Sequence, residues 1–181
     1  MRCLEVLVEE QSAAEALGVL IPKILGNDVY VRIHPFRGKP DLPRKLPDRL
    51  RGYARSLQGT DTRIAVLIDE DRQDCKELKA RLEDAAARAG LVTKTAADAG
   101  QPFIVLNRLA IEELEAWFFG DCGALRTAYP RVPKTVERQA RFRQPDAIRG
   151  GTCEQLERTL RNAGYYPSGL PKIAVARQIA Q

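Results

Sequence analysis

Short apolar runs and longer amphipathic stretches alternate through the first two thirds of the chain. The short runs are rich in β-branched residues, which favours strands, and they lie at about 2–8, 29–34, 62–69 and 103–107. The longer stretches have helical spacing, and they predict helices at 12–25, 43–57, 74–89 and 109–120. Because strands and helices alternate, we predict an α/β fold, with a parallel sheet of about four strands and helices on both faces.

The pattern changes after residue 120, where it becomes helical and irregular. A last helix begins near Pro171 and shows no stop signal at Gln181, as expected of a truncated chain. The sequence contains no repeats and no low-complexity linker. We therefore predict an α/β core at residues 1–120 and a helical extension at residues 121–181 that packs on the same domain.

Composition argues against several classes of protein. The chain has 181 residues, 44% of them hydrophobic, and no apolar run approaches the roughly 20 residues that a membrane span needs. No secretory signal is visible at the N-terminus. The four cysteines are far apart and form no CxxC pair, so we expect reduced thiols and no zinc site. These features predict a cytoplasmic protein with no membrane contact.

Two of the predicted strands end in acidic residues. Asp69 and Asp71 follow the apolar run at 64–68, and Glu9 follows the first strand. Because the carboxyl ends of neighbouring parallel strands meet at one edge of a sheet, we expect these side chains to lie together. Carboxylates in such a place need a neutralising cation, and Mg²⁺ or Mn²⁺ suits them. The alternatives are a loop that starts the next helix, for the aspartates, and a solvated turn, for Glu9.

A further acidic position lies in the predicted helix 109–120. In a helical projection an apolar arc runs from Trp117 through Ile111 to Phe119, and Glu115 falls inside it. A carboxylate on a buried face needs a partner, so Glu115 is the best candidate for a third metal ligand. A buried ion pair with an arginine is the alternative.

Basic residues are concentrated in two segments, 36–55 and 126–149, although the whole chain has a net charge of only +5. Each segment holds seven basic and two acidic residues. Basic surface beside an acidic metal pocket suits a protein that handles phosphodiesters, whereas two solvated faces are the alternative. The residues that we expect to contact nucleic acid are Arg37, Lys39, Arg44, Lys45, Arg138, Arg141 and Arg143.

Other chemistries lack support in the sequence. His34 is the only histidine, and it lies at a strand end far from any nucleophile motif. The stretch 36–40 lacks the spacing and the Ser or Thr of a phosphate-binding P-loop, although Lys39 could contact phosphate from that loop. No GxGxxG follows a strand, which argues against dinucleotide binding.

At its acidic strand ends the chain resembles the Toprim superfamily, the domain shared by topoisomerases, primases and OLD-type (overcoming lysogenization defect) nucleases. That domain carries a glutamate after its first strand and an Asp-x-Asp after its third, and Glu9 and Asp69–Asp71 match them. More closely, the whole chain resembles a bacterial domain-of-unknown-function family with a Toprim-like fold. The stretches that carry this resemblance are Leu7–Ser12, His34–Lys39, Asp69–Asp71, Glu112–Trp117 and Gly169–Ile173.

The resemblance to OLD-type nucleases implies two site residues. Glu115 matches a glutamate that adds to the nuclease metal site, and Lys172 corresponds to a lysine ahead of a late helix. Two departures bear on a second metal and on full nuclease activity: Glu10 replaces the usual Toprim glycine, and Ala13 stands where the nucleases often have a second acidic residue. The resemblance also implies an ABC-type ATPase partner in phage defence.

The leading hypothesis is a Mg²⁺- or Mn²⁺-dependent nuclease that acts on nucleic acid, with DNA favoured over RNA. Glu9, Asp69 and Asp71 would hold the metal. Glu115 would complete a second site or orient water, and Lys172 would neutralise the phosphate.

Two other hypotheses remain open. The departures at Glu10 and Ala13 favour a regulatory or effector subunit of an ATPase complex, with weak or no catalysis. A nucleotide-sugar transferase would instead use Asp69–Asp71 as its metal-binding motif, although the basic surface argues against it. A homodimer is a further candidate assembly.

Overall fold

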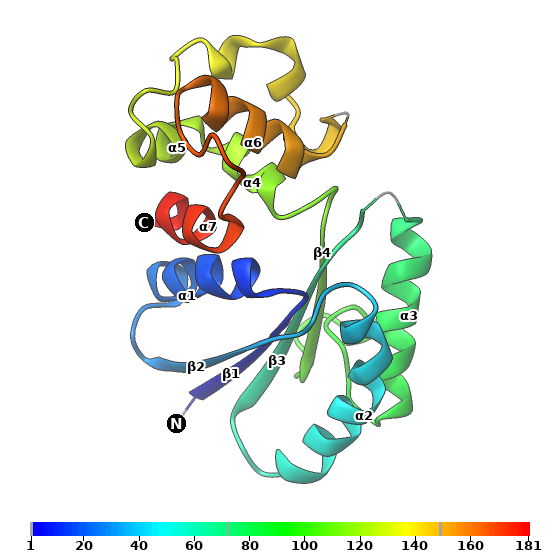
Figure 1. The fold of residues 1–181 in the computed structure, drawn as a ribbon. Coiled ribbons are helices and arrows are strands. Elements are labelled where there is room, and N and C mark those ends of the chain that lie inside the picture. The colour runs from blue at the N-terminus through cyan, green and yellow to red at the C-terminus, as the bar shows by residue number, and fades with distance from the viewer. Residues whose placement is uncertain (1, 72, 149) are drawn as a thin grey trace.

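The structure, a computed structural model, describes residues 2–71, 73–148 and 150–181, without the side chain of residue 141. Four parallel strands form one sheet in the order β2-β1-β3-β4 (Figure 1). The strands are β1 Arg2–Val8, β2 Val29–Pro35, β3 Thr62–Asp69 and β4 Val105–Ala110. The register pairs Val8 with Leu67 and Asp69 with Ala110, so β1, β3 and β4 end at the same edge of the sheet.

Helices cover both faces of the sheet (Figure 1). One face carries α1 (Gln11–Leu25) and the other carries α2 (Asp41–Ser56) and α3 (Cys75–Arg88). Side chains alternate along a strand, so Val6 and Val8 enter the core under α1, whereas Leu7 enters the core under α2 and α3. The predicted α/β fold class is thus confirmed, and the arrangement is consistent with a Rossmann- or Toprim-like sheet.

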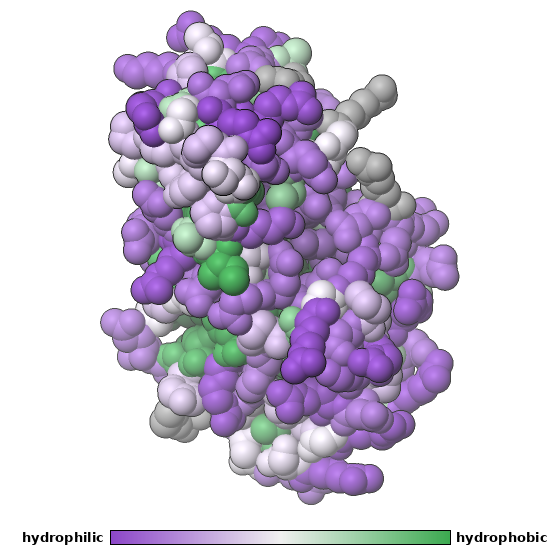
Figure 2. Space-filling model, in the orientation of Figure 1, coloured by the Kyte–Doolittle hydropathy of each residue, from purple (hydrophilic) through white to green (hydrophobic). Residues whose placement is uncertain are grey.

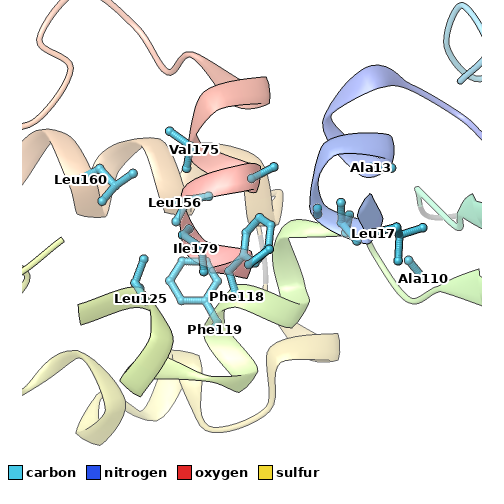
Figure 3. Close-up of a cluster of buried hydrophobic side chains, with 14 of the residues drawn as sticks. Ala13, Leu17, Ala110, Phe118, Phe119, Leu125, Leu156, Leu160, Val175 and Ile179 are labelled. Atoms are coloured by element: carbon cyan, nitrogen blue, oxygen red, sulfur yellow. The ribbon is translucent and has the colours of Figure 1, made fainter. Parts of the chain in front are cut away.

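The last third of the chain is helical, as predicted. It comprises α4 Glu115–Gly120, α5 Cys122–Ala128, the 3-10 helices Val136–Arg138, Ala140–Phe142 and Pro145–Ala147, α6 Thr152–Asn162 and α7 Lys172–Ala180. Its apolar side chains share one core cluster with α1, as Figure 3 shows for Leu17, Phe118 and Ile179. The boundary at residue 120 stays a prediction. Within the described ranges, no helix has both the length and the apolar character needed to cross a membrane.

The predicted helix 109–120 is wrong in its first half. β4 continues in register with β3 as far as Ala110, and helix α4 begins only at Glu115. Glu112 lies between them with a φ of 60°, and its carbonyl accepts a hydrogen bond from the Asp71 N–H at 2.9 Å. Pairing with β3 therefore outweighs the helical spacing of this stretch, because each added ladder position satisfies backbone groups that would otherwise be buried.

The chain leaves the carboxyl ends of β1 and β3 in opposite directions. Helix α1 leads from β1 to β2 on one face of the sheet, and α3 follows β3 on the other face (Figure 1). In open α/β sheets, ligands bind in the crevice that forms where neighbouring strands diverge in this way. The point between β1 and β3 is therefore where the fold itself favours a site.

Candidate functional site

Three carboxyl groups from three different elements gather at this edge. Glu9 directly follows β1, Asp69 is the last residue of β3, and Glu115 is the first residue of α4. A Glu9 carboxylate oxygen accepts a hydrogen bond from the Asp69 N–H at 3.3 Å. The charge of Asp69 is in turn affected by both Glu9 and Glu115. The residues Glu9 and Glu115 are 9% and 3% exposed, so solvent cannot neutralise their charge.

Burial and mutual repulsion make all three groups difficult to ionise. Burial, followed by the charges of Glu9 and Glu115, raises the pKa of Asp69 to about 8. Burial raises the pKa of Glu9 to about 7, even though the Asp69 N–H opposes the shift. Burial also raises the pKa of Glu115 to about 6, and the nearby Lys172 limits that shift. A cluster of carboxyl groups with raised pKa values at the carboxyl edge of a parallel sheet is a candidate for a functional site.

Asp71, the fourth predicted ligand, is held differently. Its carboxylate pairs with the Lys39 ammonium at 2.7 Å, and that ammonium also donates to the Glu70 carbonyl at 3.2 Å. Asp71 has a φ of 47°, a left-handed conformation that aspartate tolerates better than most residues. The aspartate therefore lies at the rim of the cluster with a cation of its own, a contact that the sequence did not reveal.

Lys172 lies beside Glu115, at the first residue of α7. Although its burial opposes the charge, the Glu115 carboxylate raises the pKa of Lys172, so this lysine stays protonated. It also hydrogen-bonds to the Cys153 thiol, whose pKa burial raises to about 11. The charged partner of the buried Glu115 is thus a lysine, where the sequence left an arginine as the alternative.

Two other glutamates near the cluster have local structural partners. The Ser12 hydroxyl donates to the Glu10 carboxylate, next to the start of α1. The Glu113 carboxylate accepts hydrogen bonds from the Thr152 hydroxyl and the Cys153 N–H, both at 2.8 Å, and so caps the start of α6. The sequence gave no signal for the Glu113 contact, because its partners lie about forty residues away.

The geometry does not yet form a ready metal centre. Among the residues that the structure describes, no group of three or more His, Cys, Asp or Glu side chains is arranged to hold a metal ion. The carboxyl groups of Glu9, Asp69 and Glu115 are close enough to interact electrostatically. Their donor chemistry is that of a hard divalent cation site.

The predicted nucleic-acid contacts divide between two ends of the molecule. Lys39 reaches the acidic cluster, whereas Arg44 and Lys45 bind Asp41 on their own helix, both at 2.8 Å. Figure 1 places the other basic segment at the far end of the molecule from α2, and Figure 2 shows hydrophilic surface at both ends. Exposed side chains there include Arg138 and Arg143, and the side chain of Arg141 lies outside the described residues.

No curated protein and no solved structure matches the chain. One family model does match, over residues 8–181, and its description is "Domain of unknown function (DUF4276)". The match begins at the end of β1 and extends to the last residue, so it includes both acidic strand ends and Lys172. The chain therefore belongs to this family of domains of unknown function.

Proposed function

We propose that the protein is a Mg²⁺- or Mn²⁺-dependent nuclease that hydrolyses phosphodiester bonds in nucleic acid, DNA rather than RNA. One observation carries the proposal: Glu9, Asp69 and Glu115 are brought together, poorly solvated, at the divergence point of a parallel sheet. Such an arrangement destabilises the fold unless a cation compensates it. Natural proteins retain costs of this kind mainly at functional sites.

The residues of the cluster would have different roles in binding the ion. Glu9 and Asp69 would hold the ion together with Asp71, and Glu115 would add a ligand or orient water. The carboxyl oxygens of these residues must move closer together when the ion binds. Among the described residues, no group of three or more His, Cys, Asp or Glu side chains is arranged to hold a metal ion. A divalent ion would supply an activated water molecule and stabilise the charge that develops on the phosphate.

Two lysines would assist the carboxylates. Lys172 stays protonated beside Glu115 and would neutralise a non-bridging phosphate oxygen. Lys39 pairs with Asp71 and would move to the phosphate when an ion takes over that carboxylate. Basic residues at the two ends of the molecule would then bind the backbone of a strand that crosses the cluster.

A Toprim-like relation to OLD-type nucleases agrees with this proposal. Three features of the fold support it: a glutamate follows β1, an Asp-x-Asp begins at the end of β3, and a glutamate begins α4. A cytoplasmic protein that works with an ABC-type ATPase partner in phage defence would follow from the same relation.

The proposal can be tested with one substitution and one control. Asp69→Asn removes the ionisable carboxyl group while keeping the shape of the side chain, and Asp98→Asn makes the same change at an exposed turn. Calorimetric titration with Mn²⁺ and a plasmid-nicking assay are run on wild type and both variants. We expect binding and nicking in wild type and in Asp98→Asn, and loss of both in Asp69→Asn. Nicking that survives in Asp69→Asn would refute the assignment.

A second candidate is a non-catalytic regulatory or effector subunit of an ATPase complex. The observation in its favour is the Lys39–Asp71 pair, in which a built-in cation already compensates one of the predicted ligands. Absence of Mn²⁺ binding by wild type in the same titration, together with co-purification of an ATPase, would make this candidate the better one.

A further inference from the structure

A separate cavity of about 840 Å³ lies between the end of the edge strand β2 and one side of helix α2. Its lining includes Ile33, His34, Phe36 and Arg37 from the strand end, and Arg49 and Tyr53 from the helix. This volume falls within the range typical of sites for small molecules. The carboxyl cluster does not line it. The cavity is therefore distinct from the site proposed above.

A fully compensated carboxylate contacts two of the residues that line this cavity, His34 and Tyr53. Glu5 on β1 is 1% exposed, and its carboxylate pairs with Arg32, with His34 Nε2 at 2.5 Å and with the Tyr53 hydroxyl at 3.1 Å. Burial opposes ionisation, but the contacts with His34, Tyr53 and Arg32 outweigh it and lower the pKa of Glu5. Its negative charge is thus satisfied from within the fold.

The Glu5 contact also fixes the histidine ring. Arg49 Nη2 lies 3.4 Å from His34 Nδ1, and a guanidinium can only donate. Nδ1 therefore accepts, and the ring proton lies on Nε2, where it bonds to Glu5. The imidazole is held in one orientation with its Nδ1 lone pair directed toward Arg49.

The wall of the cavity has more positively charged side chains than its carboxylates can pair with. Asp41 is bound by Arg44 and Lys45, and Asp48 pairs with Arg51. Arg37 and Arg49 are both exposed. In the part of the chain that the structure describes, neither of these two guanidinium groups pairs with a carboxylate.

Guanidinium groups are the preferred partners of phosphate, because their donors form a fork that matches two of its oxygens. We propose that this cavity binds a small phosphate-bearing ligand of about nucleotide size, with Arg37 and Arg49 on the phosphate. Partly buried Phe36 provides apolar surface for the rest of the ligand. The Arg49 guanidinium moves from His34 Nδ1 to the phosphate when the ligand binds.

The single histidine of the chain makes this proposal directly testable. Ring proton signals of His34 are followed by NMR in tag-free protein during titration with inorganic phosphate, AMP or a short oligonucleotide. EDTA excludes divalent ions, so failure of the proposed nuclease site has no effect on the result, and chloride at matched ionic strength corrects for salt. We expect saturable shifts with phosphate and with AMP.

Two variants distinguish binding in the cavity from non-specific attraction of phosphate to basic surface. Arg49→Gln removes one phosphate ligand, and Arg158→Gln removes an equal charge from the exposed side of α6. We expect Arg49→Gln to weaken AMP binding by about tenfold or more and Arg158→Gln to leave it unchanged. Three results would overturn the proposal: no saturable shift in wild type, equal affinity in Arg49→Gln, or a response to the oligonucleotide alone.

Discussion

Two buried glutamates lie four residues apart on the same stretch of chain, and the structure treats them in opposite ways. Glu5 is surrounded by Arg32, His34 and Tyr53, and its pKa is lowered, because these contacts outweigh its burial. Glu9 receives one backbone N–H, and burial among other carboxyl groups raises its pKa to about 7. Burial alone therefore does not determine whether a carboxylate is compensated within the fold.

The difference lies in compensation. The charge of Glu5 is balanced within the fold, so it stabilises the folded state on its own. The charges of Glu9 and Asp69 are not balanced, so the fold is more stable when these groups are protonated or when a cation is bound. The predictions below test this contrast.

The largest expected effect concerns the cationic side chain beside each kind of carboxylate, Lys172 beside Glu115 and Arg32 beside Glu5. Lys172→Gln removes the cation next to Glu115 and should lower metal-supported nicking about 100-fold, the usual cost of losing one charge-stabilising donor. Arg32→Gln, which removes a cation next to Glu5, is the control and should retain nicking. The rates are measured on a supercoiled plasmid, and equal losses in the two variants would contradict the contrast.

Removal of the two charges should change stability with opposite signs. Glu5→Gln breaks a buried set of charge-assisted contacts and should lower the free energy of unfolding by about 2 kcal/mol. Glu9→Gln relieves repulsion and should raise it by about 1 kcal/mol at pH 8 in EDTA. Urea denaturation measures both changes. A loss of stability in both variants would show that Glu9 is also a structural residue.

The pH dependence should show the same contrast. Because the pKa of Asp69 rises from 3.8 to about 8 on folding, the folded state binds the proton more tightly and loses that advantage as pH rises through this window. Without metal, Asp69→Asn should therefore gain about 1–2 kcal/mol over wild type between about pH 4 and pH 8.

Glu5 acts in the other direction. The pKa of Glu5 is lowered, so the stability that its charge contributes is present above the ordinary carboxyl pKa and is lost as pH falls through the folded value.

Denaturation curves of wild type and Asp69→Asn between about pH 4 and pH 8 measure the difference in their free energies of unfolding. A constant difference would mean that the Asp69 carboxyl group has its ordinary pKa in the folded protein.

The smallest effect concerns Lys39. Its pair with the partly exposed Asp71 should contribute only about 0.5 kcal/mol to stability, so Lys39→Gln should fold almost normally. Removal of this competing cation should strengthen Mn²⁺ binding by about two- to fivefold, as measured by calorimetry. Weaker binding in Lys39→Gln would indicate that the lysine supports the site by another route.

The strand ends could be read from the sequence, whereas the contacts between distant segments could not. The apolar runs before Glu9 and Asp69 predicted both strands, and the strand order brings these residues together. Glu115 was predicted as buried from a helix that starts six residues too early, so the burial is observed but the reason was wrong.

The role of Glu5 was missed, although a signal was present. Glu5 lies two residues before Leu7 on the same face of the strand, which places it on the α2 side of the sheet. Its partners Arg32, His34 and Tyr53 come from β2 and α2, and no local pattern in the sequence identifies them. The Lys39–Asp71 pair was missed for the same reason.

The central claim is that a divalent cation compensates the carboxyl cluster. At pH 7, Asp69 is mostly protonated and Glu9 is about half protonated in the metal-free protein, because their pKa values are about 8 and 7. Calorimetric titration of wild type with Mn²⁺ in two buffers of different ionisation enthalpy measures the protons released. We predict binding with release of about one proton per ion. No binding, or a binding heat that is identical in the two buffers, would contradict the claim.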